Sequence, residues 1–130
     1  MKYLIAVVLV MFGFGVFTHA PAQSGQEISV KVKRTASAKG GLRVQFVEMV
    51  EDSRCPTDAV CVWAGNAKIR IRVTKNGRSK VLELNSGLEP RTATFAGYSF
   101  ELKALTPEPR SNVRIDPNGY VAKIKVSRAS

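Results

Sequence analysis

Residues 68–77 read Lys68-Ile69-Arg70-Ile71-Arg72-Val73-Thr74-Lys75-Asn76-Gly77. Apolar and polar side chains alternate from Lys68 to Lys75, which is the period of a β-strand with one face on a core. Asn76-Gly77 then favours a two-residue hairpin turn, because both residues readily adopt the positive φ that this turn needs. The segment therefore predicts a strand and a hairpin, with residues 80–85 as the returning strand.

The same alternation recurs along the rest of the chain. It marks residues 28–32, 42–46 and 120–126 as strands, and β-branched and aromatic side chains add residues 92–95 and 98–105, around a turn at Ala96-Gly97. Gly40-Gly41 separates the first two segments, so we expect these two strands to pair. After Phe46 the apolar phase shifts, which indicates either a β-bulge or a strand buried on both faces.

Prolines and glycines punctuate these segments. Pro107 and Pro109 interrupt strand pairing, and Pro117-Asn118-Gly119 predicts a turn before the last strand. No segment of helical period separates the strands, and a chain of 130 residues is about one domain. We therefore predict an all-β domain, an antiparallel β-sandwich or barrel-like fold of six to eight short strands.

The first 22 residues are typical of a cleaved signal peptide. Lys2 precedes an uncharged apolar run from Leu4 to Phe17, and Ala20-Pro21-Ala22 matches the small-residue pattern of a cleavage site. We expect cleavage after Ala22 and a single mature domain of residues 23–130. The mature chain is then secreted or periplasmic, with 19 basic residues against 10 acidic ones and without the single histidine, His19.

Cys55 and Cys61 are the only cysteines. An even cysteine count in an exported chain predicts a disulfide, here one that closes a short loop. A redox pair would prefer two intervening residues, and a zinc site would need ligands that the mature chain lacks. We therefore interpret the pair as a local structural bridge.

Both cysteines lie in the segment from Glu51 to Ala67, which has the pattern D-S-R-C-P-x4-C-x-W-x-G-x-A. This pattern resembles a segment of a family of small uncharacterised bacterial exported proteins and lipoproteins. The resemblance implies export and gives no activity. The chain differs from the lipoprotein members because it has no cysteine directly after the small residues of the leader, where a lipid would be attached.

The residues of this loop motif have structural interpretations. They are Asp52, Ser53, Arg54, Pro56, Trp63 and Gly65. Asp52 or Ser53 would bind backbone amides in a turn, Arg54 would pair with Asp52 or Asp58, and Pro56 would stiffen the start of the loop. Trp63 would cover the disulfide, and Gly65 would supply a positive φ.

Two functional interpretations compete for the same loop. A braced loop at residues 54–61 carrying Arg54 suits protein recognition or protease inhibition, since a rigid loop loses little entropy on binding. The alternative interpretation is a Ca²⁺ site. Its oxygen ligands would come from acidic residues that have no known calcium-loop spacing, namely Glu48, Glu51, Asp52 and Asp58.

Basic side chains take the polar positions of several expected strands. They are Lys31, Lys33, Arg43, Lys68, Arg70, Arg72, Lys123 and Lys125. They predict a basic solvent face on one or both sheets, which would bind anionic envelope or extracellular polymers or lipid surfaces, with the plain solvated face as the alternative. This is the leading functional hypothesis, and recognition through the loop is the second.

Catalysis is disfavoured by the residue types present. The mature chain has no histidine to serve as base for a nucleophile, its cysteines are expected to be oxidised, and its glycines form no phosphate loop or dinucleotide fingerprint. Carboxylate pairs such as Glu48 with Glu51, or Glu83 with Glu101, have no spacing that selects them. We therefore expect a non-enzymatic protein without metal or cofactor.

Overall fold

A computed structural model describes Gly13, Gly15 and residues 25–129. The expected leader, its cleavage site after Ala22 and the new terminus at Gln23 lie outside the described residues, apart from the two glycines. In the described part of the chain, no helix has the length and apolarity to cross a membrane.

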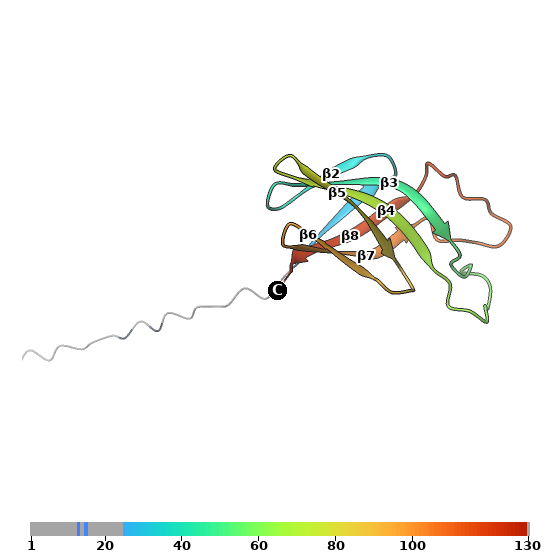
Figure 1. Ribbon diagram of the computed structural model, residues 1–130. Coiled ribbons are helices and arrows are strands. Elements are labelled where there is room, and N and C mark those ends of the chain that lie inside the picture. The colour runs from blue at the N-terminus through green and yellow to red at the C-terminus, as the bar shows by residue number, and fades with distance from the viewer. Residues whose placement is uncertain (1–12, 14, 16–24, 130) are drawn as a thin grey trace, which may run out of the picture.

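Eight strands form two four-stranded antiparallel sheets that pack face to face (Figure 1). One sheet has the order β1-β8-β7-β6 and the other β2-β3-β4-β5. The strands are β1 (Gln26–Lys31), β2 (Thr35–Ala38), β3 (Leu42–Asp52), β4 (Ala67–Lys75), β5 (Arg78–Asn85), β6 (Thr92–Phe95), β7 (Tyr98–Thr106) and β8 (Val121–Arg128). The predicted all-β class and sandwich architecture are confirmed.

The expected hairpins are present. Lys75 pairs with Arg78 across the Asn76-Gly77 turn, and Phe95 pairs with Tyr98 across Ala96-Gly97. The shift after Phe46 is a β-bulge, because the register between β3 and β4 slips between Phe46 and Glu48. Of the two alternatives, the β-bulge is therefore confirmed, and the strand buried on both faces is wrong.

One expected pairing is wrong. Residues 28–32 do not pair with residues 42–46, because β1 pairs with β8 and β3 pairs with β2 and β4. After β1 the chain crosses to the other sheet: Val32 N–H donates to Tyr120 O, and Lys33 N–H, at a φ of 67°, donates to Phe46 O. The short β2 therefore occupies the place beside β3 that we expected for residues 28–32.

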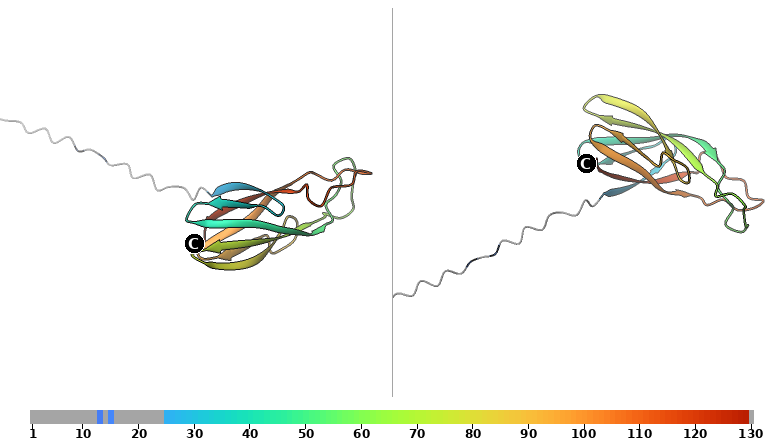
Figure 2. Two further views of the ribbon diagram at one scale, coloured as in Figure 1. Left: turned by 90° about the horizontal axis from the view of Figure 1, so that it is seen from above. Right: turned by 60° about the horizontal axis from the view of Figure 1, so that its bottom comes forward.

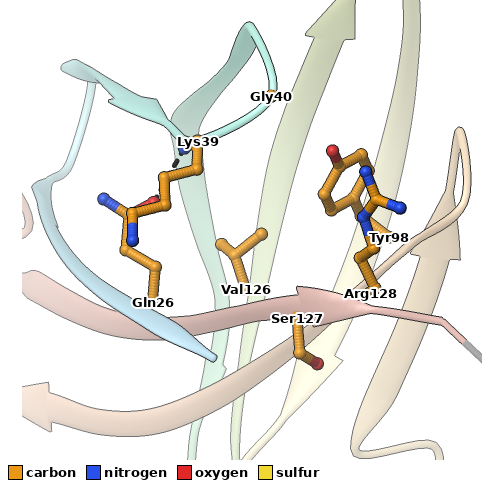
Figure 3. Close-up of a pocket in the computed structure, with 7 residues that line it drawn as sticks. All are labelled: Gln26, Lys39, Gly40, Tyr98, Val126, Ser127 and Arg128. Carbon is orange, nitrogen blue, oxygen red and sulfur yellow. Dashed lines mark hydrogen bonds between the residues drawn. The ribbon is translucent and has the colours of Figure 1, made fainter. Parts of the chain in front are cut away.

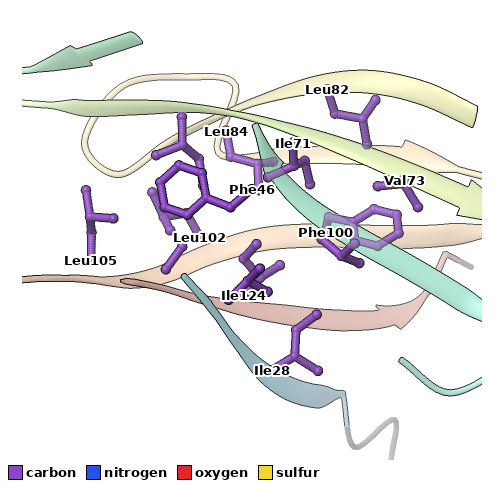
Figure 4. Close-up of a cluster of buried hydrophobic side chains, with 14 of the residues drawn as sticks. Ile28, Phe46, Ile71, Val73, Leu82, Leu84, Phe100, Leu102, Leu105 and Ile124 are labelled. Atoms are coloured by element: carbon purple, nitrogen blue, oxygen red, sulfur yellow. The ribbon is translucent and has the colours of Figure 1, made fainter. Parts of the chain in front are cut away.

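The core lies between the sheets and takes the inward side chains of both (Figure 4). Phe46, Ile71 and Leu84 enter from one sheet, and Phe100 and Ile124 from the other. In the part of the chain that the structure describes, the buried apolar residues fall between Ile28 and Val126. The eight strands and their connections therefore supply this core.

The sandwich has two different ends (Figures 1 and 2). The hairpin end carries the turns at residues 39–41, 76–77 and 96–97, together with the first residue of β1 and the last of β8. The loop end carries the longer connections 53–66, 86–91 and 107–120. This division separates the disulfide-braced loop from the hairpin turns by the length of the sheets.

Candidate functional site: the disulfide-braced loop

Cys55 and Cys61 form a disulfide with a Cα–Cα distance of 5.9 Å, as predicted. The bridge closes a ring at the loop end, between β3 and β4. Such a bond indicates an oxidising compartment, extracellular or periplasmic.

Arg54 fastens the start of this loop to the opposite sheet. Its Nε and Nη2 donate to the two carboxylate oxygens of Asp52 at 2.8 and 3.0 Å. Its Nη1 donates to Leu105 O at 2.7 Å, and Nη2 also donates to Pro107 O at 3.0 Å. The side chain is only 15% exposed. Arg54 thus pairs with Asp52 and bridges β3 to the end of β7.

Asp52 has a second partner in Tyr120, whose hydroxyl donates to Oδ2 at 2.9 Å. Burial alone raises the pKa of Asp52, but hydrogen bonds from Arg54 and Tyr120 outweigh it and hold that pKa below its ordinary value. Burial and the bond to the Asp52 carboxylate raise the pKa of Tyr120 to about 12. The three side chains form a charged but satisfied cluster beneath the loop.

Ser53 and Asn66 close the base of the loop. Ser53 N–H donates to Asn66 O at 2.7 Å, and Asn66 N–H donates to Ser53 Oγ at 3.2 Å. Between them, Gly65 has a φ of 74°, and a Cβ there would lie 2.6 Å from Ser53 O and 2.9 Å from Cys55 N. The predicted role of Gly65 is confirmed, and close backbone approach is a second reason for glycine.

Asn66 is a residue that the sequence analysis missed. Its side chain is buried, with Nδ2 donating to Asn85 Oδ1 at 3.1 Å and Oδ1 accepting from the N–H groups of Gly87 and Leu88. Asn85 Nδ2 in turn donates to Pro90 O at 2.9 Å. The pair ties the braced loop to residues 86–91. In the sequence, this pair shows only as an asparagine just before β4 and another at the end of β5, and asparagine is also common in turns.

The far side of the ring contacts the connection between β7 and β8. Thr57 N–H donates to Pro109 O at 2.9 Å, and Ser111 N–H donates to Asp58 Oδ1 at 2.8 Å. The bond from Ser111 lowers the pKa of Asp58, so this exposed carboxyl stays charged down to lower pH. Two separate loops therefore brace each other at the loop end.

The tip of the loop is apolar and points to solvent. Val60, Val62 and Trp63 are 102%, 97% and 62% exposed. Most of the Trp63 side chain therefore faces solvent, and its role as a cover for the disulfide stays a prediction. Beside the ring lies a cleft of about 280 Å³, lined by Arg54, Cys55 and Thr57 and by residues 103–106 of β7.

The basic residues named from the sequence do not form one face. Lys31, Lys123 and Lys125 lie on β1 and β8, Lys33 lies in the turn after β1, and Arg43, Lys68, Arg70 and Arg72 lie on β3 and β4 of the other sheet. They occupy opposite outer faces of the sandwich. Arg70 forms ion pairs with Glu48 and Glu83, and Lys123 forms one with Glu27. Carboxylates therefore interrupt the positive charge on both faces.

The Ca²⁺ alternative finds no ligand cluster. In residues 25–129, no group of three or more His, Cys, Asp or Glu side chains comes together as a metal site would require. Asp52 binds Arg54 and Tyr120, Asp58 binds Ser111, and Glu48 binds Arg70.

Comparison with known protein families, curated proteins and solved structures finds no match.

Proposed function

We propose that this protein is a non-enzymatic binding module that recognises a partner protein through the tip formed by Val60, Val62 and Trp63. The observation that carries the proposal is the exposure of three apolar side chains on a loop that is otherwise fixed in place. Exposed apolar clusters on folded domains mark interaction sites, and tryptophan is among the residues most enriched at binding hot spots.

The loop is organised before any partner arrives. The disulfide, the Arg54 bonds to β7 and the Asn66–Asn85 pair each hold a different part of it. A partner would therefore bind the tip without ordering the loop, and less of the interaction energy is lost to entropy. The adjoining cleft of about 280 Å³ offers space for a partner side chain next to the tip.

The charges around the tip favour a protein over an anionic surface. Asp58 and Glu108 lie on the two braced loops, together with Arg110 and Arg114. Such mixed charge suits the polar rim of a protein interface, whereas the fixed carboxylate of Asp58, two residues from Val60, would be repelled by anionic lipid. Arg54 is not the contacting residue in this proposal, because its guanidinium is held by Asp52 and two carbonyls.

The test uses residues 23–130 with a photo-crosslinking amino acid at position 62, mixed with an envelope extract of the source cells. A matched control carries the same group at Val81, another exposed valine, on β5. We expect a crosslinked protein from position 62 alone. Equal capture from both positions, or none from position 62, would reject the tip as the interface.

The captured protein is then purified and titrated against the chain. Trp63 is the only tryptophan, so its fluorescence reports directly on the tip, and we expect a blue shift on binding. Trp63→Ala should weaken the affinity at least about tenfold, as expected for a hot-spot residue. The double variant Cys55→Ser/Cys61→Ser should also weaken it, because the loop then loses its brace. Unchanged affinity in both variants would overturn the proposal.

A further inference from the structure

Positive charge is concentrated at the hairpin end, opposite the braced loop. Four segments meet there, at residues 38–43, 74–80, 94–99 and 126–129. They contain no Asp or Glu and six cations: Lys39, Arg43, Lys75, Arg78, Lys80 and Arg128. None of these six forms an ion pair with a carboxylate in the part of the chain that the structure describes. Together, the four segments at this end therefore carry positive charge alone.

Contacts between the two sheets hold the four segments together. Lys39 N–H donates to Gln26 Oε1 at 2.7 Å, which joins the β2–β3 turn to β1. Lys75 Nζ lies 4.8 Å from the centre of the Tyr98 ring, which joins the β4–β5 hairpin to β7. Tyr98 also pairs directly with Arg128 of β8. The cations thus lie on segments that contact one another.

Two hollows are lined by four of these six cations. The first, of about 270 Å³, is lined by Gln26, Lys39, Gly40, Tyr98 and residues 126–128. Figure 3 shows Val126 between Lys39 on one side and Tyr98 with Arg128 on the other. Gly40, at a φ of 85°, has no room for a side chain, because a Cβ there would overlap the Tyr98 hydroxyl.

The second hollow, of about 420 Å³, is lined by Lys75, Asn76, Arg78, Phe95 and Ala96. Each hollow therefore has two cations and one aromatic ring. Arginine and lysine bind phosphate oxygens, and tyrosine, present in the first hollow, is favoured where a protein meets the headgroup layer of a membrane.

We propose that the hairpin end binds the phosphate groups of an anionic lipid surface, with the two hollows as headgroup seats. The proposal is independent of the partner-binding tip, since it concerns other residues at the opposite end. Clusters of four to eight Lys and Arg are typical of segments that bind anionic lipids. The hairpin turns lie together at one end of the sandwich, so their Lys and Arg side chains can contact a flat surface at the same time.

The aromatic rings at the hairpin end favour lipid phosphates over nucleic acid. Nucleic-acid bases would need exposed rings for stacking, but Phe95 and Tyr98 are half-buried and Lys75 lies over one face of Tyr98.

The test measures co-sedimentation of residues 23–130 with two kinds of vesicles, phosphatidylcholine alone and phosphatidylcholine mixed with phosphatidylglycerol, over a series of salt concentrations. We expect binding to the anionic vesicles only. The variant Lys39→Gln/Arg78→Gln/Arg128→Gln should lower the partition coefficient by about fivefold for each charge removed, on the order of 100-fold in all.

The matched control is Lys31→Gln/Arg34→Gln/Arg72→Gln, which removes one Lys and two Arg outside the hairpin end. It should lose far less binding than the first variant. An equal loss in both variants would show that only net charge matters and would overturn the proposal. So would equal binding to both vesicles, or tighter binding to duplex or single-stranded DNA at the same salt concentration. Circular dichroism checks that both variants fold.

Discussion

The guanidinium of Arg54 is clamped by the carboxylate of Asp52, two residues earlier, with Nε–Oδ1 and Nη2–Oδ2 distances of 2.8 and 3.0 Å. This pair sets the direction of the guanidinium, so that its remaining N–H groups reach the carbonyls of Leu105 and Pro107. A local turn contact thereby fastens one sheet of the sandwich to the end of the other.

Replacement of Arg54 by lysine should lower the free energy of unfolding by about 2 kcal/mol, because an ammonium cannot reproduce the forked geometry and leaves carbonyls without donors. Urea unfolding measures the change. The control is Arg91→Lys, since Arg91 forms only an exposed ion pair with Glu89 at 3.8 Å and should change stability by less than about 0.5 kcal/mol. Equal effects of the two variants would contradict the bridging role.

The acid stability of the domain should depend on Asp52. Because its pKa is lower in the folded chain, its ionised form stabilises the fold above the ordinary pKa, and this share is lost as the pH falls through the folded value. Asp52→Asn should therefore flatten the decline in stability at acidic pH. Urea midpoints measured from neutral to acidic pH check this, and a variant curve parallel to the wild-type curve would contradict it.

Tyr120 should titrate late. Tyr98→Phe in residues 23–130 leaves Tyr120 as the only tyrosine, and the absorbance of its phenolate should rise with a midpoint near pH 12. The neutral phenol stabilises the fold, so its share of stability is complete below about pH 10 and is lost as the pH rises toward 12. Adding Asp52→Asn should shift the midpoint down. A midpoint near that of the unfolded chain would refute the contact with Asp52.

Two glycines allow conformational strain to be separated from close contact. Gly41 has a φ of 73° with nothing near its missing Cβ, whereas Gly65 has a φ of 74° and backbone atoms at 2.6 and 2.9 Å. Gly41→Ala should cost about 1 kcal/mol of stability through φ alone. Gly65→Ala should cost about 1–3 kcal/mol more because of the added overlap. Equal losses in thermal unfolding would show that the loop adjusts freely.

The sequence predicts those parts of the fold that depend on neighbouring residues. Alternation and turn residues predict every strand except β2, together with both two-residue hairpins, and the cysteine spacing predicts the disulfide. They also show that the apolar phase shifts after Phe46, but not whether this shift is a bulge. Strand partners are a different problem. β2 is four residues long, with the sequence Thr35-Ala36-Ser37-Ala38, and has too little apolar character to signal that it, and not β1, lies beside β3.

The candidate sites were predicted only in part. Local sequence suggests that Arg54 pairs nearby, but it carries no information on Tyr120, 68 residues from Asp52. The exposure of Trp63 is equally hidden, because an aromatic residue beside a disulfide usually indicates packing. The concentration of charge at the hairpin end arises from four distant segments, so no window of the sequence displays it.

The lateral edges of the sandwich bear on how the molecule behaves in a crowded compartment. The edge strands lie beside one another, β1 against β2 and β5 against β6, and β2 and β6 have only four residues each. Short edges give another chain little backbone to pair with, which discourages sheet-to-sheet aggregation. Two of the four edge strands are protected in this way, and the longer β1 and β5 each lie beside one of them.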